Sequence, residues 1–146
     1  MYMRDEILTG KPTVKYLVLG MLGKGTFGLV LRCEQEGTGI QTAVKVIKNL
    51  PAYRRQAMIE VQTLRMLTVE CASKNCTCIV QSYESFEFKK HVCIVFELLG
   101  PSLLDLLSRR RYRGLPLDVV IGVAFQLFSA LKLLHDNMTM MLSIVT

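Results

Sequence analysis

The sequence predicts an α+β fold in which one helix packs on a five-stranded antiparallel sheet and two further helices follow. Three short apolar runs in the first third of the chain are joined by tight connections, as in an antiparallel meander. A helical apolar pattern comes next, then two more strand-like runs, and only then the two helical segments. With 146 residues, 51% of them hydrophobic and 21% charged, the chain can form a folded domain and is too apolar to be disordered.

The sheet and its helix are predicted over residues 16–99, after a loose lead-in over residues 1–15. Strands are predicted over residues 16–22, 29–34 and 42–48, where short apolar runs end at turn signals. A helix begins near Pro51, which a first helical turn tolerates, and its apolar stripe includes Ala57, Val61 and Leu64. The small, polar residues 71–77 predict a loop, and strands over residues 78–86 and 92–96 complete the sheet.

The two remaining helices are predicted over residues 100–137, followed by a divergent tail over residues 138–146. Ser102 and Asp105 have the spacing of a capping box, which predicts a helix that runs into an arginine-rich segment. Apolar residues then recur at helical spacing over residues 117–134. Within this run Asp118, Gln126 and Lys132 favour a buried helix over a membrane span.

The charge and cysteine content indicate a protein of the cytoplasm or nucleus. No apolar signal segment follows Met1, and five cysteines, an odd number, indicate reduced thiols. The spacing of Cys71, Cys76 and Cys78 lacks the second ligand pair that zinc requires, so no metal site is predicted. The net charge of +6 is a weak pointer to an anionic partner, and the arginines at 109–111 and 113 are interpreted as a solvated helix end.

A glycine-rich segment at residues 23–30 follows the pattern G-x-G-x-x-G-x-V. In a dinucleotide-binding fold the third glycine of such a pattern opens a helix, whereas here it opens a strand. The glycines are therefore expected at the bend of a β-hairpin, where backbone N–H groups can approach a phosphate chain closely. A Walker A loop is excluded, because Val18 stands where its first glycine would lie. A glycine-rich hairpin without a ligand remains the alternative.

Two charged residues stand where the pattern expects apolar ones. Lys45 lies in the third strand and is flanked on its own face by Ala43 and Ile47, because side chains alternate along a strand. An unpaired buried ammonium is costly or loses its proton, so Lys45 needs a counter-charge. Glu60 falls on the apolar stripe of the helix that packs over this strand, so a Lys45–Glu60 ion pair is predicted. A snorkelling lysine and a solvated glutamate remain the alternative.

Three motifs together resemble the small lobe of eukaryotic protein kinases: Gly23-x-Gly25-x-x-Gly28-x-Val30, Ala43-Val44-Lys45 and Glu60. Residues 46–56, 91–99 and 112–117 are similar to the DYRK branch of that family, with its HIPK and YAK relatives. The resemblance extends from Tyr16 to Asn137. It implies a kinase-like small lobe and hinge over residues 16–99 and the start of an incomplete large lobe over residues 100–137.

The resemblance also implies ATP as the cofactor. The glycine loop would cover the ATP phosphates with Phe27 at its tip, and Lys45, held by Glu60, would bind the α- and β-phosphates as the catalytic pair. Leu22, Val30 and Ala43 would sandwich the adenine.

Three further roles follow from the same resemblance. Phe96 would be the large gatekeeper at the back of the pocket, and the backbones of Glu97 and Leu99 would bind adenine at the hinge. Asp105 would lie near the ribose, although helix capping is an equally good role for it. The implied nucleotide-contacting residues are Leu22, Gly23, Lys24, Gly25, Thr26, Phe27, Gly28, Val30, Ala43, Lys45, Phe96, Glu97, Leu99 and Asp105.

Catalysis in this family needs motifs that the sequence does not contain. The catalytic loop should follow Leu134-His135-Asp136-Asn137, but no His/Arg-Asp-Leu-Lys-x-x-Asn run and no Asp-Phe-Gly occurs. These motifs supply the catalytic aspartate and the Mg²⁺ ligands. We therefore expect a chain truncated before the catalytic loop, inactive alone and a weak binder of ATP. A truncated reading frame, splice product or incomplete gene model is favoured over an evolved minimal protein.

The sequence thus predicts the ATP-binding portion of a DYRK-like Ser/Thr or dual-specificity protein kinase, with protein substrates only for a full-length product. The alternative is a non-catalytic regulatory fragment that binds a protein partner through the helix over residues 117–134. The apolar stripe of that helix would be exposed without the rest of a large lobe. A third alternative is an unstable fragment. Neither a membrane nor a nucleic acid is expected as a partner.

Overall fold

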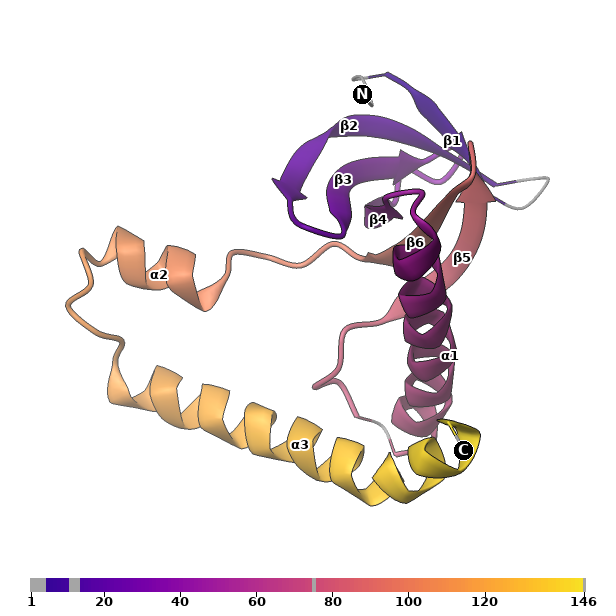
Figure 1. Ribbon diagram of the computed structural model, residues 1–146. Helices are drawn as coiled ribbons and strands as arrows, with labels where there is room; N and C mark the ends of the chain where they lie inside the picture. The colour runs from indigo at the N-terminus through magenta and orange to yellow at the C-terminus, as the bar shows by residue number, and fades with distance from the viewer. Residues whose placement is uncertain (1–4, 11–13, 75, 146) are drawn as a thin grey trace. The chain divides into compact units, whose positions relative to one another are not determined.

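The computed structural model of the chain describes residues 5–10, 14–74 and 76–145, with side chains as far as Asp136. The chain divides into two compact units, residues 1–74 with 80–99 and residues 75–79 with 100–146. The first unit contains a sheet and one long helix, α1 (Pro51–Ser73), and the second contains α2 (Leu103–Arg109) and α3 (Leu117–Val145) (Figure 1).

The sheet of the first unit has six strands in the spatial order β1-β2-β3-β4-β6-β5, and every neighbouring pair is antiparallel. The predicted meander of three consecutive strands is confirmed by the pairing of β2 with β3 and of β3 with β4. The strands are β1 (Ile7–Thr9), β2 (Lys15–Lys24), β3 (Gly28–Gln35), β4 (Gln41–Ile47), β5 (Ser82–Phe88) and β6 (His91–Glu97).

The structure confirms the α+β class but differs from the sequence prediction at several boundaries. The loose lead-in is wrong for Ile7–Thr9, which pairs with β2 and buries Leu8 completely, so the sheet has six strands instead of five. α1 continues to Ser73, so the predicted loop at residues 71–77 begins too early. The strand predicted over residues 78–86 is displaced, because β5 begins at Ser82 and continues to Phe88.

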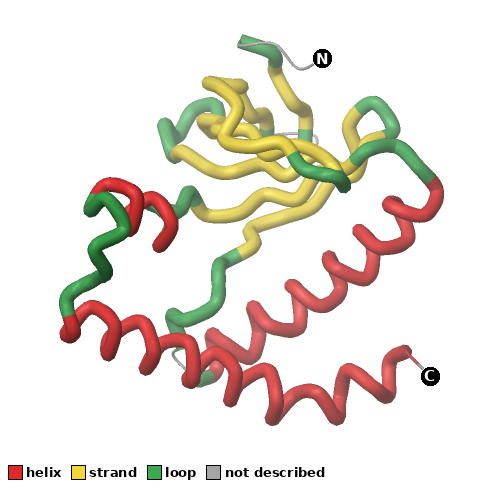
Figure 2. Tube along the Cα trace, turned by 60° about the vertical axis from the view of Figure 1, so that its left-hand side comes forward, coloured by secondary structure: helices red, strands yellow, loops and turns green. Residues whose placement is uncertain are grey.

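The two faces of the sheet bury separate apolar clusters. One face holds a cluster built entirely from strands, including Leu8, Leu31 and Val44. The other face packs against α1, which contacts β4, β5 and β6 and contributes Ala57 and Val61 to the second cluster. The strands form one curved layer with α1 on one side (Figure 2). Because side chains alternate along β4, Val44 and Lys45 point to opposite faces, and Lys45 shares the α1 face.

The second unit begins with a capped helix, as predicted. The backbone N–H of Ser102 donates to Asp105 Oδ2 at 2.8 Å, and the backbone N–H of Asp105 donates to Ser102 Oγ at 3.1 Å. This reciprocal pair is the capping box, and it satisfies two N–H groups at the start of α2.

α3 is longer than the sequence predicts, and its apolar side chains are largely exposed. The helix expected over residues 117–134 continues to Val145, through the predicted tail, whose side chains lie outside the described residues. The stretch Leu117–Asp136 is long and apolar enough to cross a membrane by length and composition alone, with 6% of its most apolar window buried. The first expectation, a buried helix, is therefore wrong in this structure, whereas the exposed apolar stripe expected for this helix without the rest of a large lobe is observed. The exposed side chains include Leu117, Phe125 and Phe128.

Candidate functional site

The glycine-rich segment forms the bend of the β2–β3 hairpin, as the sequence predicts. The backbone N–H of Gly25 donates to the carbonyl of Gly28 at 2.8 Å, which closes the bend. Lys48, just after β4, makes two hydrogen bonds to the loop tip. Its backbone N–H donates to Phe27 O at 2.9 Å, and its Nζ donates to Thr26 O at 2.7 Å. The loop is therefore positioned by backbone acceptors of its own tip, which leaves its side chains free for other contacts.

The three positions of this loop are occupied by glycine for different structural reasons. A Cβ on Gly28 would lie 2.1 Å from the carbonyl oxygen of Val46, so only glycine lets β3 approach β4 this closely. A Cβ on Gly23 or Gly25 would meet no atom within 4 Å. The fold therefore requires Gly28, while Gly23 and Gly25 leave open space along the backbone, where a ligand can approach it.

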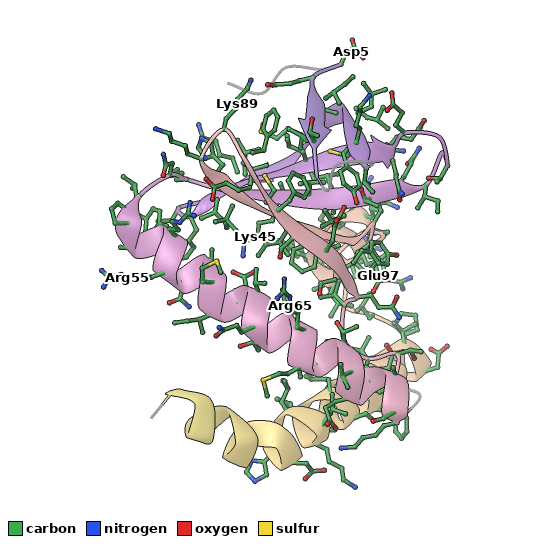
Figure 3. All side chains as sticks on the ribbon, turned by 90° about the vertical axis from the view of Figure 1, so that its right-hand side faces the viewer. Asp5, Lys45, Arg55, Arg65, Lys89 and Glu97 are labelled. Carbon is green, nitrogen blue, oxygen red and sulfur yellow. The ribbon has the colours of Figure 1, made fainter. Side chains whose placement is uncertain are left out.

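Lys45 and Glu60 form the ion pair that the sequence predicts. Lys45 Nζ lies 2.6 Å from Glu60 Oε1, and the two side chains are 29% and 30% exposed. Lys45 comes from the middle of β4, between Val30 and Ile94 on the neighbouring strands. Figure 3 shows Lys45 in the space between the sheet and α1. The pairing offsets part of the cost of removing both charges from water and fixes the ammonium next to the sheet surface.

A cavity of about 420 Å³ joins this ion pair to the glycine loop. The ring of Phe27, at the loop tip, packs edge-on against Tyr53 of α1 with ring centroids 5.3 Å apart. The structure thus brings Phe27, Lys45 and Glu60 together around one space. The lining residues are Phe27, Lys45, Ile47, Ala52, Tyr53, Gln56, Ala57 and Glu60.

Glu60 was predicted as a site residue of α1, but Ala52, Tyr53 and Gln56, which also line this cavity, were missed by the sequence analysis. Tyr53 precedes Ala57 by four residues and Glu60 by seven, so all three fall on one face of a helix. This spacing could have identified Tyr53 as a site residue, because Glu60 was already assigned to that face.

The strand residues expected around adenine lie on or beside the same face of the sheet. Register places Val30 opposite Lys45 and Ala43 opposite Phe96, and directly paired residues point to the same side. Phe96 also packs against the cluster under α1. Leu22, near the end of β2, is half-exposed.

The hinge is expected at the end of β6 and in the residues that follow it. The backbone N–H of Glu97 donates to Gln81 O at 3.0 Å, and Glu97 Oε1 accepts from the backbone N–H of Gln81 at 2.8 Å. Leu99 is exposed and is the last residue of the first unit. Asp105 belongs to the second unit, where its carboxylate caps α2. The hydrogen bonds from Ser102 hold its pKa below the usual value.

The loop offers open glycine backbone and β4 offers a fixed ammonium, two features that suit a phosphate-bearing ligand. The sequence matches the family model for the protein kinase domain over residues 16–142. The chain belongs to the protein kinase family. Kinases of this family use ATP with Mg²⁺ and act on protein substrates.

Individual relatives place this chain more closely within the family. The serine/threonine-protein kinase AFC3 of Arabidopsis thaliana is 40% identical over 124 residues, which cover 85% of this chain and 30% of that protein. Homeodomain-interacting protein kinase 2 of Mus musculus is 42% identical over 124 residues, covering 85% of this chain and 10% of that protein. The crystal structure of another kinase domain matches with a TM-score of 0.80 and 30% identity, over 93% of this chain and 38% of that one.

These matches confirm the resemblance to the DYRK, HIPK and YAK branch, and they extend it to kinases of the CLK and AFC type. They also confirm a kinase small lobe followed by the first helices of a large lobe. The chain spans about a third or less of the curated relatives named above.

Proposed function

We propose that this chain is the ATP-binding portion of a DYRK-like Ser/Thr kinase of the dual-specificity type. The observation that carries the proposal is the Lys45–Glu60 ion pair at a cavity that the glycine loop borders. A lysine held by a carboxylate is a positioned cation, and a triphosphate is the anion for which kinases use it.

Each side chain has a physical task in this proposal. Backbone N–H groups near Gly23 and Gly25 approach the phosphates, because no side chain occupies that space. The Lys45 ammonium neutralises charge on the α- and β-phosphates, and Glu60 holds it in place. Phe27 at the loop tip excludes water from the phosphate side.

The adenine end of the site is proposed from the sheet register. Leu22, Val30 and Ala43 supply its apolar walls, with Phe96 at the back. The backbones of Glu97 and Leu99 read the base edge. Asp105, already capping α2, contacts the ribose.

We propose that the chain as given holds nucleotide without transferring phosphate. The 146 residues contain no Asp-Phe-Gly, which in kinases supplies the main Mg²⁺ ligand. Mg²⁺ bound with ATP would neutralise phosphate charge, and this chain's own contribution is to bind and orient the nucleotide. Incubation with labelled Mg-ATP and a basic protein should give no phosphorylated product, and robust transfer would refute this part.

Nucleotide binding is tested by thermal unfolding of the purified chain. At a Mg-ATP concentration ten times its Kd, binding stabilises by about 1.4 kcal/mol, which raises the Tm by about 3–6 °C for a chain of this size. Lys45→Ala should abolish this shift, whereas Lys15→Ala, which removes a lysine paired at the surface with Glu36, should retain it. Absence of any shift at millimolar nucleotide would contradict the ATP-binding proposal.

A second candidate function is favoured by the exposure of α3. Leu127 and Leu131 are 56% and 49% exposed on a long apolar helix, and such surface is typical of a protein interaction site. In this alternative the chain is a regulatory subunit of the cytoplasm or nucleus. A partner that co-purifies with the chain and is lost on Leu127→Asp and Leu131→Asp would support it.

A further inference from the structure

A second cavity, of about 410 Å³, lies between α1 and β5, entirely within the first unit. It shares no lining residue with the cavity at Lys45. Its volume is in the range of sites that hold a small ligand or a few peptide side chains. The lining residues are Val61, Leu64, Arg65, Thr68 and Val69 of α1, Ser82, Tyr83, Glu84 and Ser85 of β5, and Ile94 of β6.

The cavity lies at the edge of the sheet. Side chains alternate between the faces of a strand, so four consecutive lining residues of β5 place the cavity at the strand's border and not under one face. β5 is the last strand in the sheet order, so its outer backbone groups pair with no strand in the described sheet. Such an edge is a template for an added extended segment. At the far end of β5, Arg54 Nη2 of α1 lies 2.6 Å from Glu87 Oε2, so this part of the strand is tied to the helix by an ion pair.

One uncompensated charge faces this space. Arg65 lines the cavity and, within the described part of the chain, forms no ion pair (Figure 3). Glu84 is the acidic residue of the lining, and its carboxylate already accepts a hydrogen bond from Tyr16 Oη at 2.6 Å. Val61 and Ile94 are 5% and 1% exposed and supply an apolar base. The cavity therefore combines an available guanidinium with an apolar surface.

The spacing of these groups fits an extended peptide. Val61 and Arg65 are four residues apart on α1, about 6 Å along the helix axis. In an extended chain, residues i and i+2 point to the same side and lie about 6.6 Å apart. An acidic side chain at one position can thus reach Arg65 while an apolar side chain two residues away packs on Val61.

We propose that this cavity is a docking site for an extended peptide that adds to the outer edge of β5. The peptide places a carboxylate on Arg65 and an apolar side chain over Val61 and Ile94. The site is spatially separate from the nucleotide cavity, because no residue lines both cavities.

The probe is a short fluorescein-labelled peptide in which threonine and valine alternate and one central valine is replaced by aspartate. Its binding to the full chain is followed by fluorescence polarisation. We expect the matching peptide with asparagine to bind about fivefold to tenfold more weakly, since it lacks the charge. Arg65→Gln should weaken the aspartate peptide by the same factor and remove the preference for aspartate.

Controls separate this site from general charge attraction and from misfolding. Arg55→Gln removes another exposed arginine of α1, outside the cavity, and should bind as the wild type does. Arg65→Glu should prefer a peptide with lysine at the central position, and Thr68→Trp, which fills the cavity, should lose both peptides. Alternate N-methylation of the peptide backbone should abolish binding, because it blocks strand pairing.

Several results would overturn the proposal. Equal affinity of wild type and Arg65→Gln for the aspartate peptide, or equal loss in Arg55→Gln, would remove the assigned role of Arg65. Displacement of the peptide by Mg-ATP would place it in the other cavity. A further such result is that a single-stranded oligonucleotide or anionic lipid vesicles displace the labelled peptide from the wild type and bind Arg65→Gln more weakly. That result would assign the site to a different class of partner.

Discussion

Replacing Gly28 by alanine tests whether the third glycine of the loop serves the fold rather than a ligand. The new Cβ would lie 2.1 Å from Val46 O, 3.0 Å from Val46 C and 3.1 Å from Ile47 Cα, all backbone atoms. A carbon and a carbonyl oxygen ordinarily approach no closer than about 3.3 Å. The ends of β3 and β4 must therefore separate by about 1 Å where Gly28 pairs with Ile47.

The expected cost combines two destabilising effects and one smaller stabilising effect. Forcing an extra methyl group into a packed region costs about 1–3 kcal/mol, and weakening one or two ladder hydrogen bonds costs about 1 kcal/mol each. Alanine also restricts the unfolded chain, which offsets about 0.4–1 kcal/mol. The free energy of unfolding of Gly28→Ala should thus fall by about 2–4 kcal/mol, measured by urea denaturation with far-UV circular dichroism.

Gly25→Ala is the matched control, because its Cβ would meet no atom within 4 Å. Its free energy of unfolding should stay within about 1 kcal/mol of the wild type, and it should lose part of the thermal shift with Mg-ATP. If Gly28→Ala unfolds at the same urea concentration as Gly25→Ala, the close approach of β3 to β4 is not what requires glycine.

Three further outcomes are expected. Burial raises the pKa of the Cys33 and Cys93 thiols to about 12, so mass spectrometry of the native chain at pH 8 should show iodoacetamide on the other three cysteines first; early labelling of Cys33 would contradict the burial. Burial, and then a hydrogen bond to a carboxylate, raise the pKa of Tyr16. Its protonated form therefore stabilises the fold below the usual pKa of about 10, and this stability is lost as the pH rises above it. The fall in urea midpoint above that pH should shrink in Tyr16→Phe, and an unchanged fall would implicate other groups. An NMR titration should give Asp105 a pKa below its usual value, shifted upward in Ser102→Ala; an unshifted value would mean that the capping box is not formed.

The part of the site that the sequence could predict is the part that breaks a local pattern. Lys45 interrupts an apolar strand face and Glu60 interrupts an apolar helix stripe. Because the strand and the helix pack together, each of these charges needs the other as its counter-charge. The glycine spacing is likewise a local signal, and its position between two predicted strands indicates that it forms the bend of a β-hairpin. Conversely, the contact of Phe27 with Tyr53 depends on how the loop folds over α1, which no local pattern encodes.

The errors in the fold have the same origin. β1 has three residues and one buried side chain, Leu8, so its strand state comes from pairing with β2 and not from its own periodicity. The last turn of α1 contains Cys71 and Ser73, which suggest a loop by composition, yet the helix continues through them.

The separation of the two apolar clusters has a mechanical consequence. The strand-only cluster holds the sheet together without any residue of α1, whereas α1 is attached by Ala57 and Val61, with Tyr53 and Leu64 packed beside them. Detaching the helix exposes much less apolar surface than opening the sheet, so α1 is the low-energy opening unit and its amides exchange with deuterium before those of β3 and β4. Lys45 belongs to the stiff element and Glu60 to the compliant one. The distance between Lys45 Nζ and Glu60 Oε1 therefore depends on the position of α1 relative to the sheet. A contact that moves α1 changes this distance and with it the position of the lysine ammonium.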